Sequence, residues 1–389
     1  MGEWQVKPLL LKGVSSWDRH LVKLWTGTKW EWRKIRRYSY LPVGVLYGSG
    51  QFGPNEYKIF TDPNNQLVHS TNILLPINLF SRVHKVELNG WNMFHVLSFA
   101  SSNEVFNIGG RATGVGTYRF IVGLTKKMSQ STDHALRIDA NDSLWAVGDN
   151  TNGRLGDGTE ITRSTQVQIG NAKWKNIYAG NSCSVGIQEN GSAWMWGYIP
   201  IAHFLNEDIP TTALEPTLLS TEKWKICIGG HDTILGIKED GTLWGCGFNT
   251  YGELGDGTKN PNYTLTQIGT AKWKSIHYYM YSVFGIQEDG TLWTWGFNQY
   301  GQLGDGTTVD KLVPTKIGTT KWKVVKGSLA TLGIQEDDSL WAWGVNGGTY
   351  GNGTTENSAV PILISSEKWL DVATCWGMVS LAVKFTEYV

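Results

Sequence analysis

The sequence predicts an all-β protein, a β-propeller built from tandem repeats of about 49 residues. This prediction rests on a recurring glycine-rich motif, on two evenly spaced ladders of tryptophan, and on strand-like alternation between them. The motif is clearest at 292–307, LWTWGFNQYGQLGDGT, and it recurs at 243–258, at 144–159 and, in shortened form, at 340–354. Repeats of this length bury a shared core against their neighbours, so no single copy folds alone.

The tryptophans set the period. Members of the first ladder stand in the Leu-Trp part of the motif, 48 to 50 residues apart: Trp145, Trp194, Trp244, Trp293 and Trp341. Members of the second ladder stand mostly within Lys-Trp-Lys, 47 to 50 residues apart: Trp174, Trp224, Trp273, Trp322 and Trp369. The second ladder follows the first by about 29 residues, which leaves room for two hairpins in each unit.

The hairpin signal lies between the ladders. Phe284-Gly-Ile-Gln is followed by Glu-Asp-Gly-Thr and then by Leu-Trp-Thr-Trp-Gly, which indicates strand, tight turn and strand because Asp-Gly supplies positive φ. In Trp293-Thr-Trp295 both indoles leave one face and are expected to pack. In Lys272-Trp-Lys274 the indole is expected to point inward between two solvated ammonium groups. No helical period competes, so we expect about four strands per unit, arranged as blades.

The copies differ in clarity along the chain. Degenerate repeats occupy 1–130 and clear repeats 131–389, and we expect 1–389 to be a single propeller domain. Seven complete second hairpins can be traced, and an eighth unit starts at Lys368-Trp369 but lacks its Leu-Trp strand. Glu3-Trp-Gln-Val6 is a candidate for that strand, so N- and C-terminal strands would close the ring. The count predicts seven or eight blades.

Composition argues against several classes of site. The 34 basic and 34 acidic residues cancel, which gives no electrostatic basis for binding nucleic acid. The 4 cysteines lack paired spacing and are expected to be free core thiols, not zinc ligands. The aspartates of the Gly-Asp-Gly-Thr turns lack the pattern of a calcium loop, so we expect them to bond backbone N–H groups. No metal or cofactor is predicted.

No catalytic residue is predicted either, and we expect that the protein is not an enzyme. No Ser-His-Asp order, carboxylate pair or phosphate-binding loop stands out from the repeats. His95 and His134 share one repeat position and are interpreted as hydrogen-bonded histidines lining the central channel. The sequence has neither a secretory signal nor an apolar run of 18 residues, which predicts no membrane span and a cytoplasmic or virion-associated location.

The motif L-W-x-x-G-x-N-x-x-G-x-L-G-D-G-T, over about 145–354, resembles the regulator of chromosome condensation (RCC1) repeat family. The clean LGDGT turns are most similar to those of bacterial and phage members. The resemblance implies a β-propeller, usually of seven blades, and a function in protein binding, such as nucleotide exchange on a small GTPase, β-lactamase inhibition or scaffolding. Nothing in this chain matches the exchange factor's active wedge or its basic tail.

Departures from the repeat consensus are the candidate binding positions, because packing requires the consensus and a partner does not. These departures are an insertion between Tyr47 and Phe106, an apolar loop after Trp196, and an aromatic-rich segment at 277–281. Exposed aromatic loops on a rigid scaffold are typical of binding surfaces, although each departure can also be a local insertion packed on its own blade. The candidate residues are Tyr198, Ile199, His203, Phe204, His277, Tyr278, Tyr279, Tyr281, Phe52 and Tyr57.

Together these patterns predict a non-catalytic protein-interaction propeller. We expect it to be a structural or surface-recognition component of a multi-protein assembly such as a phage particle. One alternative is a regulator that binds an enzyme or small GTPase, as the family resemblance implies. Another is a propeller that binds cell-surface glycan through the same exposed aromatics.

Overall fold

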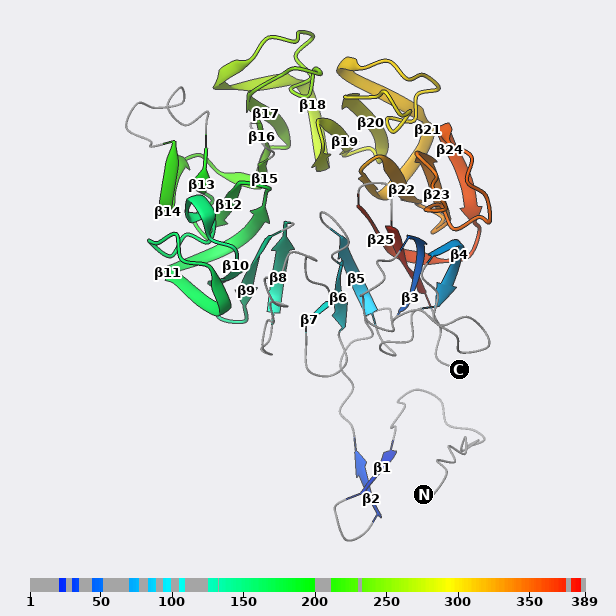
Figure 1. Cartoon of the computed structure of the whole chain (residues 1–389), viewed down its shortest axis with the longest axis horizontal. Helices are drawn as coiled ribbons and strands as arrows, with labels where there is room; N and C mark the ends of the chain where they lie inside the picture. The colour runs from blue at the N-terminus through cyan, green and yellow to red at the C-terminus, as the bar shows by residue number, and fades with distance from the viewer. Residues whose placement is uncertain are drawn as a thin grey trace. The chain divides into compact units, whose positions relative to one another are not determined.

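The computed structural model describes 125–131, 133–199, 211–229, 233–375 and 379–385 and, in the N-terminal third, only strands. Its contacts separate two units, Met1–Pro42 and Val43–Val389. In the first unit, β1 (Leu21–Trp25) pairs antiparallel with β2 (Trp30–Lys34). The repeats lie in the second unit (Figure 1).

One repeat illustrates the architecture. The second half of β18 (Asn262–Tyr279) pairs with β19 (Ser282–Gln287), β19 pairs with β20 (Thr291–Gly296), and β20 pairs with the first half of β21 (Lys311–Gly327), all antiparallel. The second half of β21 then opens the next sheet. A long strand thus ends one four-stranded unit and begins the following one, as the two-hairpin period predicts.

The same order recurs on both sides of this repeat. The strands before it are β8 (Thr125–Gln130), β9 (His134–Asp139), β10 (Ser143–Gly148), β11 (Arg163–Ala179), β12 (Cys183–Gln188), β13 (Ala193–Tyr198), β14 (Thr212–Ser220), β15 (Trp224–Gly229), β16 (Thr233–Lys238) and β17 (Thr242–Gly247). The strands after it are β22 (Ala330–Gln335), β23 (Leu340–Gly344) and β24 (Ser358–Ser365). From β8 to β24 each strand hydrogen-bonds to its sequence neighbour except across β14 and β15, where one sheet ends and the next begins.

The last sheet joins distant parts of the sequence. It contains β25 (Trp369–Cys375), β26 (Val379–Phe385), β3 (Gly44–Gln51), β4 (Ser70–Pro76), β5 (Val83–Leu88), β6 (Phe94–Ser98) and β7 (Val105–Ile108). Strand β26 pairs with β3 from Val379 opposite Gly50 to Phe385 opposite Gly44. The strand missing from the last unit therefore comes from 44–51, which the sequence analysis had given to a hairpin of its own. The expected donor, 3–6, lies outside the described residues.

The second tryptophan ladder forms part of the core as predicted, whereas the first packs against the core from positions that are only partly buried. The second ladder is buried throughout, and in its third member Trp273 lies between exposed Lys272 and Lys274. The ring of Trp273 covers Gly285, where a Cβ would lie 2.4 Å from it, so only glycine fits there. The first ladder is only half-buried: Trp293 lies at the surface of its strand, and its Nε1 donates to Thr291 Oγ1 at 3.0 Å.

The described residues contain one short 3-10 turn, Thr151–Gly153, and no helix that is long and apolar enough to cross a membrane. Cys183, Cys227 and Cys246 are free and buried, as expected for core thiols. Burial raises the pKa of Cys246 to about 12, so this thiol stays protonated and unreactive.

Candidate partner-binding surface

In three repeats, one asparagine holds the loop after the third strand. In the repeat of β20, Asn298 Nδ2 donates to Asp305 Oδ1 and to Thr307 O, both at 3.1 Å, and Asn298 Oδ1 accepts from Leu303 N at 3.0 Å. Asn150 and Asn249 make the same set of bonds in their repeats. Asp305 also accepts from Thr307 N at 3.1 Å, so the turn aspartates bond the backbone as predicted. Within the described part of the chain, no group of three or more histidine, cysteine or acidic residues is placed to hold a metal ion.

Two of these loops are also clamped against the following repeat. Trp295 Nε1 donates to Glu253 O at 2.9 Å, and Trp343 Nε1 donates to Gln302 O at 2.8 Å. A Cβ on Gly255 would lie 2.8 Å from Trp295 Nε1, so glycine allows the loop to approach this closely. The loop backbone is therefore fixed, and its variable positions are displayed on a rigid support.

Two neighbouring repeats display aromatic rings at these positions. We call Tyr251, Tyr281, Phe297 and Tyr300 the aromatic cluster. The ring of Tyr251 lies 5.0 Å from that of Tyr281 and 4.9 Å from that of Phe297, and Phe297 lies 5.9 Å from Tyr300. Tyr300 is 47% exposed and the other three are half-buried. These contacts between ring edges and faces make a continuous aromatic surface across a repeat boundary.

A strained turn holds one ring of the cluster in place. Met280 and Tyr281, which link β18 to β19, have φ of 46° and 67°, the left-handed region that costs non-glycine residues about 1 kcal/mol each. Phe297 N donates to Tyr281 O at 2.9 Å, and a Cβ on Gly296 would lie 2.1 Å from that oxygen. The packing around the turn therefore overcomes the strain and fixes the position of Tyr281.

The structure separates the predicted residues of 277–281. Tyr281 belongs to the aromatic cluster, whereas Tyr278 is only 4% exposed and lies in the interior. His277 is half-buried, its ring 6.2 Å from that of Phe284 and its Nε2 3.1 Å from Gly327 O in the next repeat. Tyr279 is half-buried at the end of β18. Tyr281 thus contacts the ring of Tyr251 in the aromatic cluster.

The loop after Trp196 is described only at its start. Tyr198 is 40% exposed, but Ile199 is 2% exposed and faces the core. The positions His203, Phe204, Phe52 and Tyr57 lie outside the described residues.

Sequence reasoning missed Tyr251, Phe297 and Tyr300, because these residues lie inside the consensus motif and were treated as packing. The signal was present at the variable positions of the motif. Two adjacent copies read F-N-x-Y-G, with a phenylalanine and a tyrosine, whereas another copy has Asp149 and Asn152 at these two positions.

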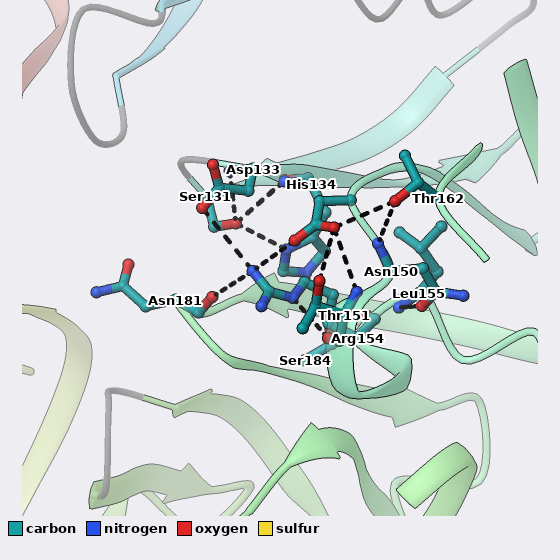
Figure 2. Close-up of polar contacts among 11 residues, drawn as sticks. Ser131, Asp133, His134, Asn150, Thr151, Arg154, Leu155, Thr162, Asn181 and Ser184 are labelled. Carbon is teal, nitrogen blue, oxygen red and sulfur yellow. Dashed lines mark hydrogen bonds and ion pairs between the residues drawn. The ribbon is translucent and has the colours of Figure 1, made fainter. Parts of the chain in front are cut away.

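In that other copy the same region is a polar network (Figure 2). Buried His134 lies with Nδ1 2.7 Å from Ser131 Oγ and Nε2 2.8 Å from Ser184 Oγ, and Ser184 Oγ donates to Arg154 O at 2.8 Å. Burial, assisted by the charge of Arg154, lowers the pKa of His134 to about 3, so the ring is neutral. Because the Ser184 proton is committed to Arg154 O, this Ser–His pair offers no nucleophile. His134 is buried and hydrogen-bonded, as expected.

The charged groups of this network pair with one another. Arg154 Nη1 donates to Asn181 O at 3.1 Å and lies 3.5 Å from Asp149 Oδ2 and 3.8 Å from Asp133 Oδ2, and Nε donates to Thr151 O at 3.0 Å (Figure 2). The guanidinium is thus occupied by its own loop and by the turn of the next repeat.

Comparison with known proteins identifies the repeat. Residues 289–328, a stretch somewhat shorter than one period that includes Asp305 and Trp322, match the family model described as the regulator of chromosome condensation (RCC1) repeat. Residues 289–328 form an RCC1 repeat. The resemblance drawn from the motif is thereby confirmed, whereas the particular similarity to bacterial and phage members stays a prediction. No curated protein matches this chain in sequence.

Solved structures share its fold at low identity. Human WBSCR16 is 16% identical and aligns over 90% of this chain and 100% of its own, with a TM-score of 0.72. Yeast RCC1 (Prp20), solved with bound Kap60, is 13% identical over 90% of both chains, with a TM-score of 0.74. Prp20p from Saccharomyces cerevisiae, described together with its binding to Gsp1p and histones, is 14% identical over 90% of this chain and 93% of its own, with a TM-score of 0.74. The chain is therefore an all-β protein with the fold of these RCC1-like propellers.

Proposed function

We propose that this RCC1-repeat chain is a non-catalytic protein-binding propeller whose binding surface is the aromatic cluster. The observation that carries the proposal is a continuous set of rings across two repeats, held by fixed loops and a strained turn, with Tyr300 half exposed. Tyrosines on rigid supports contribute large contact area at little cost in conformational entropy and are enriched among interface hot spots. The cluster residues carry no charge, which favours a partner that offers apolar groups.

We also infer a ring of seven units. Seven hairpins occupy the second and third strand positions: β26–β3, β6–β7, β9–β10, β12–β13, β16–β17, β19–β20 and β22–β23. The pairing of β26 with β3 supports closure, because it joins the two ends of the repeat array and covers edges that would otherwise be free.

A second candidate is a regulator that binds an enzyme or a small GTPase. It is favoured by the likeness in fold to Prp20p, whose description includes binding to Gsp1p and histones. Membership of a phage particle and recognition of cell-surface glycan stay hypotheses, and both would use exposed aromatics such as Tyr300.

The test compares two surface variants of the full chain in its native host. Tyr300→Ser removes the most exposed ring of the cluster. Val309→Ser is the matched control, because Val309 is a 64% exposed apolar residue outside the cluster. Each form is purified under mild conditions, and proteins that co-migrate with it are identified and quantified by mass spectrometry.

We expect a specific protein to co-purify with the wild type and with Val309→Ser, and to be reduced at least about tenfold with Tyr300→Ser, the loss expected for a hot-spot tyrosine. Several structural proteins in one large particle would indicate an assembly component, and a single soluble enzyme or GTPase would indicate a regulator. Equal recovery with both variants would disprove the aromatic cluster as the binding surface. Binding to a glycan array, with no protein retained, would favour the glycan-binding alternative.

A further inference from the structure

A buried carboxyl group lies beneath the aromatic cluster. Glu253 is 0% exposed, and its Oε2 accepts a hydrogen bond from Tyr251 N at 2.8 Å. The bond fixes the backbone of a cluster residue. The other carboxyl oxygen, Oε1, is buried and has no hydrogen-bond partner among the described residues. An unpaired buried carboxylate is costly, so the protonation state of this group needs an explanation.

The next repeat shows what this position requires. Gln302 occupies the place of Glu253 in the motif. Its Oε1 accepts from Tyr300 N at 3.1 Å, and its Nε2 donates to Ser282 Oγ at 3.2 Å. Ser282 Oγ in turn donates to Phe297 O at 2.7 Å. The side-chain amide of Gln302 therefore accepts a hydrogen bond from the loop backbone and donates one to the Ser282 hydroxyl, whose own proton is used in the bond to Phe297 O.

The repeat of Glu253 preserves the hydroxyl but not the amide. Thr233 takes the place of Ser282, and its Oγ1 donates to Phe248 O at 2.9 Å. With its proton committed, the Thr233 hydroxyl offers only acceptor capacity to a further partner. A carboxylate offers no donor, whereas a carboxylic acid offers one O–H and so reproduces the donor and acceptor set of Gln302.

The surroundings of Glu253 also favour the neutral acid. Burial raises its pKa, Asp310 before β21 raises it further, and hydrogen bonds from backbone N–H groups of its own loop oppose the rise. Across the repeat boundary lies Tyr278 of β18, a buried residue. The pKa of Tyr278 is also raised, by burial first and then by Glu253, Tyr281 and Tyr178, whereas a hydrogen bond with Thr233 opposes the rise. Asp310 is itself paired with Lys259, whose Nζ lies 3.2 Å from Asp310 Oδ2, but no lysine or arginine among the described residues pairs with Glu253.

We propose that Glu253 is a neutral carboxylic acid in the native fold, taking the role that Gln302 plays in the next repeat, and that its ionisation loosens the 248–253 loop beneath the aromatic cluster. The loop would then carry Tyr251 away from Tyr281 and Phe297 as pH rises. The proton site rests on the geometry of the two repeats and on the burial of the carboxyl group. Ionisation of Glu253 would also weaken partner binding, and this part of the proposal rests in addition on the proposed function.

The sign of the effect follows from proton linkage. The folded pKa of Glu253 lies above the ordinary value of 4.5, so the native state holds the proton longer than the unfolded state does. Its contribution to stability is complete below pH 4.5 and is lost as pH rises through the folded pKa. An ordinary surface glutamate would show no such loss.

The experiment measures urea unfolding of the full chain across a series of pH values from about 4.5 to about 8.5, a range that brackets raised carboxyl pKa values. Glu253→Gln is the test variant, because it installs the residue found at this position in the next repeat. We expect its urea midpoint to rise relative to that of the wild type as pH increases. Gln302→Glu is the reciprocal variant, and it should acquire an additional loss of midpoint as pH increases. A constant difference between Glu253→Gln and the wild type would overturn the proposal.

Hydrogen exchange on the wild type provides a measurement that needs no variant. The amide of Tyr251 bonds to Glu253 and that of Tyr300 bonds to Gln302, so the two serve as test and control within one molecule. After correction for intrinsic rates, we expect the protection of Tyr251 alone to fall, by at least about tenfold, as pH rises. Parallel behaviour of both amides would contradict the proposal. Neither measurement involves a partner, so failure of the partner-binding test would leave this result standing.

Discussion

The polar loop at 149–154 and the aromatic loops at 248–253 and 297–302 occupy the same place in three repeats, yet they present opposite surfaces. Each of the three is held by an asparagine at the same repeat position: Asn150, Asn249 or Asn298. In the polar loop, Arg154 pairs with its own neighbours, whereas in the aromatic loops the rings pack edge to face and leave Tyr300 exposed. The comparison shows that the fixed positions build the scaffold and the variable positions set what the scaffold displays.

The two regions also respond to pH in opposite directions. In the polar region, His134 is buried and neutral, so acid opposes the native state. In the aromatic region, Glu253 is buried and its pKa is raised, so base opposes the native state. Each region contains one buried titratable group, and burial shifts the pKa of each in the direction that favours its neutral form.

The largest expected effect concerns acid sensitivity of the polar region. The pKa of His134 falls from 6.5 to about 3, so below pH 6.5 the unfolded state binds more protons and stability is lost as pH falls. We expect a loss of about 2 kcal/mol between pH 6.5 and about pH 5. Urea unfolding should show this slope in the wild type and a reduced slope in His134→Gln. Identical slopes would mean that His134 is solvated in the native state.

The next effect tests the hydrogen-bond chain of the same region. Ser184→Ala leaves both Arg154 O and His134 Nε2 without their partner, and we expect the free energy of unfolding to fall by about 2 kcal/mol. Ser182→Ala, two residues away and only partly buried, should change it by less than about 0.5 kcal/mol. A cost for Ser184→Ala as small as that of its control would show that the chain does not stabilise the fold.

An intermediate effect compares the clamps of the two regions. Trp295 Nε1 donates to Glu253 O, whereas Trp196, its equivalent in the polar region, is equally buried and its Nε1 has no partner among the described residues. Both Trp→Phe substitutions remove similar packing volume. Trp295→Phe should therefore cost about 1 kcal/mol more than Trp196→Phe in thermal or urea unfolding. Equal costs would show that the clamp acts through packing alone.

The smallest effect tests the strained turn against an unstrained equivalent. Met280 and Asn152 both have positive φ, at 46° and 61°, but asparagine tolerates this region and methionine does not. Met280→Gly should stabilise the chain by about 0.5 kcal/mol, the net of relieved strain and added chain entropy. Asn152→Gly should be neutral within error in the same unfolding assay. Destabilisation by Met280→Gly would mean that its side chain contributes more packing than the strain costs.

The repeat sequence by itself determined the local structure. The turn signals between Ile286 and Leu292 were enough to predict the hairpin, and the Lys-Trp-Lys pattern predicted the buried indole of Trp273, because both depend on residues close in the chain. The free, buried cysteines and the backbone-bonded turn aspartates followed from the same kind of reasoning. The sequence also directed attention to Tyr281, although it placed buried Tyr278 and Ile199 beside it as equals.

Only the tertiary structure decided which residues meet across repeat boundaries. The pairing of β26 with β3 joins segments more than three hundred residues apart, and no local pattern encodes that choice. The aromatic cluster brings Tyr251 of one repeat against Tyr281 and Phe297 of the next, and the burial of Glu253 depends on the same packing. A period in the sequence specifies what each copy contains. Exposure and the pKa of a side chain depend on the neighbouring copy, because that copy excludes the water and supplies the contacts.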